Sequence, residues 1–224
     1  MRLLALSAAL AFVALALVAH HAAGPTEPDD AVLGWFVDRR TGWLTVVALV
    51  VTNLFSPAAA WVGALTFGAL SWRRTRSLAA LALATATLGA ALTVNSVTKL
   101  LVQRPRPPLD LQLVYASGYA YPSGHTTGTL AFTGIIAVML CRDRSRRARI
   151  VAALLVALAT VAVALTRLYL GVHWLTDVCG GALLAGSVLA AGAWATGRYL
   201  RRPTSVAQVG EPDPCNLRNS RPIT

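Results

Sequence analysis

The residues best suited to chemistry are a histidine and an aspartate four positions apart, His173 and Asp177, at the start of an apolar run. At that spacing on a helix the imidazole and the carboxylate lie on one face. Asp177 can then hold one ring nitrogen while the other acts as a nucleophile. Asp177 is also the only acidic residue in the last three apolar runs, where a carboxylate is costly unless a cation pairs with it. The pair therefore predicts nucleophilic catalysis by His173.

A second segment, Pro122 to His125, precedes another apolar run. Ser123 is placed to cap the expected helix, and the backbone N–H groups around Gly124 should face outward at a helix N-terminus, where anions bind readily. His125 stands at the rim of that site and is placed to protonate a leaving alkoxide as a general acid. The simpler interpretation is an interfacial histidine that caps the helix.

A third segment is basic. Lys99, the only lysine in the chain, lies near the end of an apolar run that Pro105 and Pro107 should terminate. The turn would let Arg106 fold back toward Lys99, so that an ammonium and a guanidinium could hold phosphate oxygens. Alternatively, both side chains only extend to the membrane interface. Arg104 lies beside this pair and is expected to contact a lipid headgroup at most.

Together these segments resemble the type 2 phosphatidic acid phosphatase family. The signature of that family is Lys, six residues and Arg-Pro; then Pro-Ser-Gly-His; then Ser-Arg, five residues, His, three residues and Asp. The matching stretches here are, in order, Lys99 to Arg106-Pro107, Pro122 to His125, and Thr166-Arg167 to His173 to Asp177. The one departure is Thr166 in place of Ser, which keeps the hydroxyl but adds a methyl group.

The resemblance implies a lipid phosphatase that needs neither a metal nor a cofactor. In such an enzyme His173 attacks phosphorus and becomes a phosphohistidine, Asp177 orients it, and His125 protonates the leaving oxygen. The phosphate would be held by Lys99, Arg106, Ser123, Gly124 and Arg167. Phosphoryl transfer depends mainly on positioning and electrostatic stabilisation, which three cations and a helix terminus can supply. The family shares this pocket with vanadium-dependent haloperoxidases, although a membrane architecture argues against that reaction.

Membrane helices are the elements expected to position these residues. The chain of 224 residues is 56% hydrophobic and only 13% charged, and a helix needs about 20 apolar residues to cross a bilayer. We predict an all-α, polytopic membrane bundle of about six transmembrane helices. Its apolar segments are 3–18 (retained rather than cleaved as a signal peptide), 41–72 (divided at Ser56-Pro57 into a short interfacial helix and a span), 77–102, 123–141, 150–167 and 174–196. Residues 22–40 have the composition of an acidic outer loop.

Basic residues set the expected orientation. The net charge of +11 comes from arginines clustered beside apolar runs, at 73–76, 142–149 and 198–202, which fits cytoplasmic loops better than nucleic-acid binding. This places the chemical residues on the extracytoplasmic side of the plasma membrane. We expect one membrane domain, 1–202, with the signature in 99–177, followed by a disordered cytoplasmic tail, 203–224.

The expected partners are the bilayer and a membrane lipid phosphate, while the oligomeric state stays open. Undecaprenyl pyrophosphate is the favoured substrate, because that carrier is released at the outer face. Phosphatidic acid and phosphatidylglycerol phosphate are alternatives, since the motifs bind only the phosphate. A transporter or another non-enzymatic polytopic protein is the alternative from a different class. The charged residues gather at one depth rather than along a path through the bilayer, which disfavours that alternative.

Overall fold

Helices make up all the regular structure in residues 2–22 and 24–199, the part of the chain that the computed structural model describes. Four of them are long and apolar enough to cross a membrane. These are α5 (Ala79–Val102), α6 (Gly124–Cys141), α7 (Arg146–Tyr169) and α8 (Leu175–Tyr199). The predicted polytopic helical bundle is confirmed.

The long apolar stretch before α5 forms two helices, α3 (Gly42–Leu54) and α4 (Pro57–Thr75). Their axes differ by 44°, and counted together they provide a fifth span. Ser56 begins α4, because its hydroxyl accepts a hydrogen bond from the Ala59 N–H and Pro57 takes the first helical position. The predicted division at Ser56-Pro57 is therefore confirmed.

The N-terminal helix α1 (Arg2–His21) packs along α8. Its described apolar part, Leu6–His21, is shorter than the four long spans. A sixth crossing by α1 consequently stays a prediction, as does the division into a membrane domain and a tail. The third arginine cluster and residues 203–224 lie outside the described side chains.

One expectation about the N-terminal segment was wrong: residues 22–40 are not only a loop but contain helix α2 (Glu27–Val37). Thr26 and Asp29 form a reciprocal capping box at its start, and a proline sits in the first turn. The proline and the acidic residues that suggested a loop are thus the start signal of a helix.

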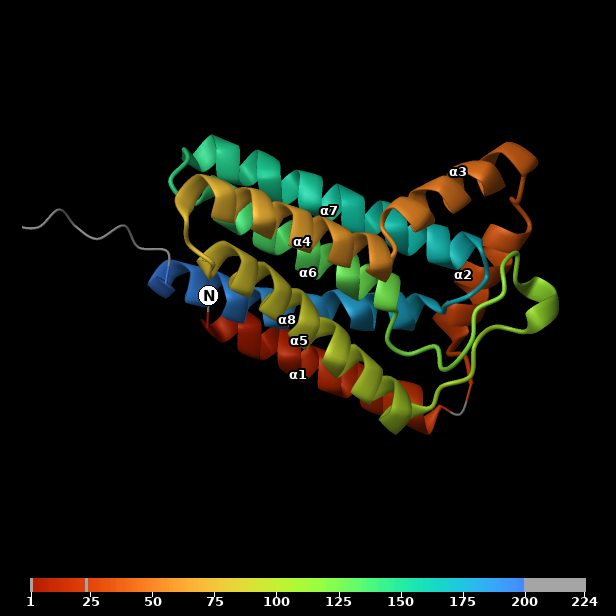
Figure 1. Cartoon of the computed structure of the whole chain (residues 1–224). Coiled ribbons are helices and arrows are strands. Elements are labelled where there is room, and N and C mark those ends of the chain that lie inside the picture. The colour runs from red at the N-terminus through yellow and green to blue at the C-terminus, as the bar shows by residue number, and fades with distance from the viewer. Residues whose placement is uncertain (1, 23, 200–224) are drawn as a thin grey trace, which may run out of the picture.

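Figure 1 shows the spans side by side, with the α4–α5 and α6–α7 loops at one end of the bundle. The arginines at 73–76 and 142–149 lie in those loops and in the adjoining helix turns. Helices α2 and α3, the segment 103–123 and the α7–α8 turn lie at the opposite end. The short 3-10 helix η1 (Leu109–Leu111) belongs to that second group.

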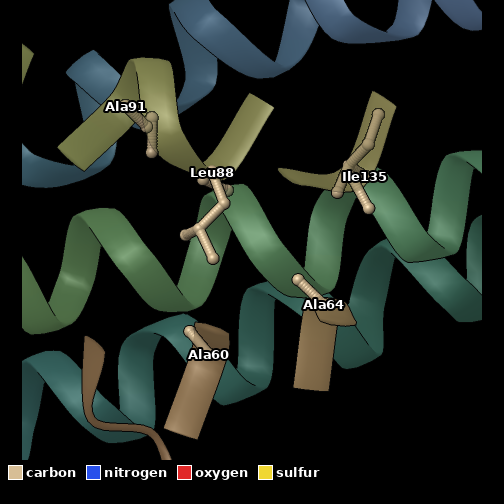
Figure 2. Packing of buried hydrophobic residues seen from close by; sticks show 8 residues of the cluster. Ala60, Ala64, Leu88, Ala91 and Ile135 are labelled. Atoms are coloured by element: carbon tan, nitrogen blue, oxygen red, sulfur yellow. The ribbon is translucent and has the colours of Figure 1, made fainter. Parts of the chain in front are cut away.

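Small residues hold the spans close together. Ala60 and Ala64 of α4, Leu88 and Ala91 of α5, and Ile135 of α6 form one buried cluster (Figure 2). Alanine at three of these five positions lets helix backbones approach in lipid, where dispersion and fit rather than water exclusion drive helix association. This packing fixes the relative positions of the helix ends that carry the polar residues.

Candidate active site

His173 occupies the turn between α7 and α8 and is only 3% exposed. Gly171 makes this turn possible, because its φ of +69° is a conformation that side chains rarely adopt. Arg40 holds the loop from outside: its Nη2 donates to the carbonyls of Leu111 at 2.8 Å and Tyr169 at 3.0 Å. Arg40 therefore joins the end of α7 to the segment at Leu111, which restrains the turn that carries His173.

The contacts of His173 specify which ring nitrogen is protonated. Nδ1 lies 3.3 Å from Oδ2 of Asp177, and Nε2 lies 3.3 Å from Nη1 of Arg106. A guanidinium has only donors and a carboxylate only acceptors, so Nδ1 carries the proton and Nε2 carries the lone pair. This is the tautomer that a nucleophilic Nε2 requires.

The surroundings of His173 also keep its ring neutral. Burial holds the pKa of the imidazole well below its usual value, and nearby positive groups lower that pKa further. Those groups are, from strongest to weakest, Arg106, Lys99, Arg167 and His125. The predicted cations and the second histidine thus all lie close enough to act on one imidazole.

The three predicted phosphate-binding cations come from different elements. Lys99 on α5 donates from Nζ to the carbonyls of Tyr119 at 2.6 Å and Ala120 at 3.1 Å. Arg106 donates from Nη1 to the carbonyl of Val172 at 2.6 Å, directly before His173 in the chain. Lys99 therefore faces the segment before Pro122, and Arg106 faces the α7–α8 turn.

Arg167 is buried near the end of α7 and donates from Nη1 to Oγ1 of Thr52 at 2.8 Å. Thr52 belongs to α3, so the bent helix pair helps to aim this guanidinium. Nε of Arg167 is buried without a hydrogen-bond partner among the described residues, which leaves donor capacity suited to an anion. Thr166 beside it donates to the carbonyl of Val163 at 2.7 Å, so its hydroxyl is used within α7.

The segment Pro122 to His125 starts α6, as predicted, with Ser123 at the N-cap position. The Ser123 side chain does not cap the helix, however; its hydroxyl accepts a hydrogen bond from Thr126 instead. The Ser123 N–H donates to the Asp177 carbonyl at 2.9 Å, which ties the start of α6 to α8. Gly124 and His125, both half-buried, open the first turn of the helix beside this tie.

Asn95 of α5 braces the same turn and has no counterpart among the predicted site residues. Its Nδ2 donates to the carbonyl of Pro122 at 3.3 Å and to Oγ1 of Thr127 at 3.1 Å. The only signal in the sequence was an amide in the middle of an apolar run. Such a residue is costly in a membrane unless its hydrogen bonds are satisfied.

The largest departure from expectation concerns Arg104. It was expected to contact a headgroup at the surface, but its side chain is 0% exposed and lies between two carboxylates. Nη1 is 2.8 Å from Oδ1 of Asp177, and Nη2 is 2.6 Å from Oδ2 of Asp29. The buried carboxylate of Asp177 required a cation, and the cation is this arginine from the adjacent segment.

Two other features do not belong to the site. In the described part of the chain, no three His, Cys, Asp or Glu residues gather in a way that could hold a metal ion. A groove of about 630 Å³ between α6, α7 and α8 has an apolar lining apart from Thr196 and two arginines, Arg142 and Arg149. Because it lies at the end of the bundle with the basic loops, it is separate from the histidines.

Comparison with known proteins agrees with this geometry. A model of the PAP2 superfamily matches residues 77–201, which include every signature segment. The chain belongs to the PAP2 superfamily. It is 30% identical over 178 residues to phosphatidylglycerophosphatase B of Bacillus subtilis (strain 168), covering 76% of this chain and 84% of that protein.

A solved structure extends the likeness to three dimensions. The crystal structure of a transmembrane PAP2 type phosphatidylglycerolphosphate phosphatase from Bacillus subtilis superposes with a TM-score of 0.77 at 26% identity. It covers 88% of this chain and 98% of that one. The predicted family is confirmed, and this PAP2 protein is a membrane hydrolase that acts on phosphoric ester bonds of lipids.

Proposed function

We propose that this PAP2 phosphatase hydrolyses the phosphomonoester of phosphatidylglycerol phosphate through a phosphohistidine on His173, without a metal ion. The proposed chemistry rests on the contacts of His173, whose ring faces Asp177 on one side and Arg106 on the other. The substrate follows from the names of the two Bacillus relatives, which describe phosphatidylglycerophosphate phosphatases.

The first half of the reaction transfers the phosphoryl group to the enzyme. Nε2 of His173 attacks phosphorus, the bond between phosphorus and the lipid oxygen breaks, and His125 gives its proton to that leaving oxygen. Asp177 accepts the Nδ1 hydrogen bond and stabilises the positive charge that develops on the ring. Phosphatidylglycerol leaves, and phosphate stays bonded to nitrogen.

The second half regenerates the histidine. His125, now neutral, takes a proton from water, the water oxygen bonds to phosphorus, and the bond from phosphorus to Nε2 breaks. Lys99, Arg106 and Arg167 neutralise the equatorial oxygens in both steps, while Ser123 and the Gly124 N–H complete the pocket at the start of α6. Inorganic phosphate is the product.

The charge distribution supports a site on the extracytoplasmic face. The arginines at 73–76 and 142–149 lie in and beside the α4–α5 and α6–α7 loops at one end of the bundle, and the α7–α8 turn, which carries His173, lies at the other end (Figure 1). Arginine-rich short loops are retained in the cytoplasm. An outward site also keeps undecaprenyl pyrophosphate in consideration, since that lipid is released at the outer face, and the test therefore includes it.

The test is phosphate release by the purified full chain in detergent with EDTA, from phosphatidylglycerol phosphate, undecaprenyl pyrophosphate and phosphatidic acid. We compare wild type with His173→Ala and with His21→Ala, which changes an exposed histidine of α1. Metal-free release that is fastest from phosphatidylglycerol phosphate, survives in His21→Ala and disappears in His173→Ala supports the proposal. Preference for either other lipid overturns the substrate, and release by His173→Ala overturns the mechanism.

A further inference from the structure

Behind the catalytic pair lies a chain of buried charges that no signature segment contains as a whole. It runs from Asp177 through Arg104 to Asp29, and all three side chains are 0% exposed. The residues come from α8, from the segment after α5, and from α2. Their juxtaposition joins the N-terminal part of the chain, which lies outside the matched region 77–201, to the carboxylate that holds His173.

Each oxygen of Asp177 has a separate task. Oδ2 accepts from the Trp174 N–H at 2.8 Å and faces Nδ1 of His173 at 3.3 Å. Oδ1 accepts from Nη1 of Arg104 at 2.8 Å. Because Arg104 holds Oδ1, the carboxylate cannot rotate and the second oxygen stays aimed at the imidazole.

Asp29 in turn holds Arg104. Its Oδ2 accepts from Nη2 of Arg104, and its Oδ1 accepts from the backbone N–H of Thr176 at 2.8 Å. That N–H belongs to the first turn of α8, where a negative charge is favoured by the helix dipole. Burial alone would raise the pKa of Asp29, but hydrogen bonds from Thr176, Thr26 and Arg104 together lower it, so the carboxylate is charged.

The charge of Asp29 affects the catalytic pair through Arg104. A guanidinium paired with Asp177 alone would neutralise the carboxylate on which His173 depends. With Asp29 as a second partner, the three groups together carry one negative charge. That charge remains available to stabilise the ring as it becomes positive during phosphoryl transfer.

We propose that Asp29 and Arg104 are positioning residues for the His173–Asp177 pair, and that α2 therefore belongs to the catalytic apparatus rather than to a peripheral cover. This inference rests on the proposed function, since it concerns the same nucleophile. A purely structural role does not explain these residues well, because buried ion pairs often contribute little net stability compared with apolar side chains.

The experiment compares four variants with wild type: Asp29→Asn, Arg104→Met, the double variant, and Asp30→Asn. Asp30 is the matched control, because it is the neighbouring acid in the same turn of α2 but is exposed. We expect Asp29→Asn and Arg104→Met to lower kcat about tenfold or more, as losses of orienting partners do, with KM within about twofold. Asp30→Asn should match wild type.

The double variant separates positioning from folding. It leaves Asp177 as the one buried carboxylate without its cation, whereas Arg104→Met leaves both Asp177 and Asp29 unpaired, so the double variant should unfold at a higher temperature than Arg104→Met. Its kcat should equal that of Arg104→Met, because Asp29 acts through Arg104. Wild-type kcat in the folded double variant, or a kcat loss equal to that of Arg104→Met in Asp30→Asn, would overturn the inference.

A second readout does not depend on activity. In ¹⁵N spectra of histidine-labelled protein, wild type should show His173 protonated at Nδ1 only, and the double variant should show a mixture of tautomers. An unchanged tautomer overturns the inference even if wild type releases no phosphate. Wild type that fails to release phosphate, with the tautomer shifted in the double variant, would contradict the proposed function and leave the positioning of His173 supported.

Discussion

Replacing Gly181 by alanine should disturb the active site, although Gly181 itself has no role in the proposed reaction. Gly181 faces the start of α6, and a Cβ there would come 2.7 Å from the Ser123 carbonyl oxygen, 3.1 Å from Oγ1 of Thr127 and 3.3 Å from Cβ of Thr126. The first neighbour is backbone. Oγ1 of Thr127 donates a hydrogen bond to the Ser123 carbonyl at 2.9 Å, so neither atom can move away from the new Cβ without the other.

The magnitude follows from these distances. Ordinary contacts of a Cβ begin at about 3.4 Å, so the start of α6 must move away from α8 by several tenths of an ångström. Overpacking of this kind costs about 1–3 kcal/mol of stability. A misplacement of about 1 Å costs about a hundredfold in rate, so a shift of roughly half that size should lower kcat about tenfold.

Gly186→Ala is the matched control, since it makes the same chemical change in the same helix at a position where the added Cβ would meet no atom of a neighbouring element within 4 Å. Phosphate release and thermal unfolding in detergent are measured for both variants. Gly186→Ala should keep wild-type kcat and unfold no earlier, because alanine favours the helix by up to about 1 kcal/mol relative to glycine. Equal kcat in the two variants would refute the claim that close α6–α8 packing positions the phosphate pocket.

Two further predictions each concern a single side chain of the site, His173 and Thr52. Because burial and nearby cations lower the pKa of His173, its ring should stay neutral as the pH falls from about 8 through 6.5, the ordinary value for histidine; a ¹⁵N titration with a midpoint near 6.5 would contradict this. Thr52→Val removes the hydroxyl that accepts from Arg167, a hydrogen bond to a charged group worth about 1.5–3 kcal/mol, so kcat/KM should fall about tenfold or more. Thr75→Val, which changes an exposed threonine at the other end of the bundle, should have no effect on phosphate-release kinetics, and a similar loss there would exclude the orienting role of Thr52.

The spans and the three signature segments could be predicted because their signals are local. Uncharged runs of bilayer length specify helices, and Ser56-Pro57 specifies a break whatever surrounds it. The gathering of Lys99, Arg106 and His173 at one end also follows, because each stands near the end of a run and the loops fix the direction of each span. Their individual roles in the reaction remain predictions.

The residues behind the site could not be predicted because their partners are distant in sequence. Asp29 reads as a loop acid, and Arg104 reads as one of many interfacial arginines. Only the packing of α2 against the start of α8 brings their charges together. The sequence did indicate that a buried Asp177 needs a cation nearby. It could not indicate which of the nineteen arginines would supply that cation.

The buried Asp29 also has a consequence for biosynthesis. Its partner Thr176 is 147 residues further along the chain, which takes about 7–30 s to translate at 5–20 residues per second. During that interval the carboxylate of the nascent chain lacks its place at the start of α8, and His173 has not been made. Chains interrupted before α8 are therefore expected to be inactive, so phosphatase activity should emerge only when the last span joins the helices inserted first.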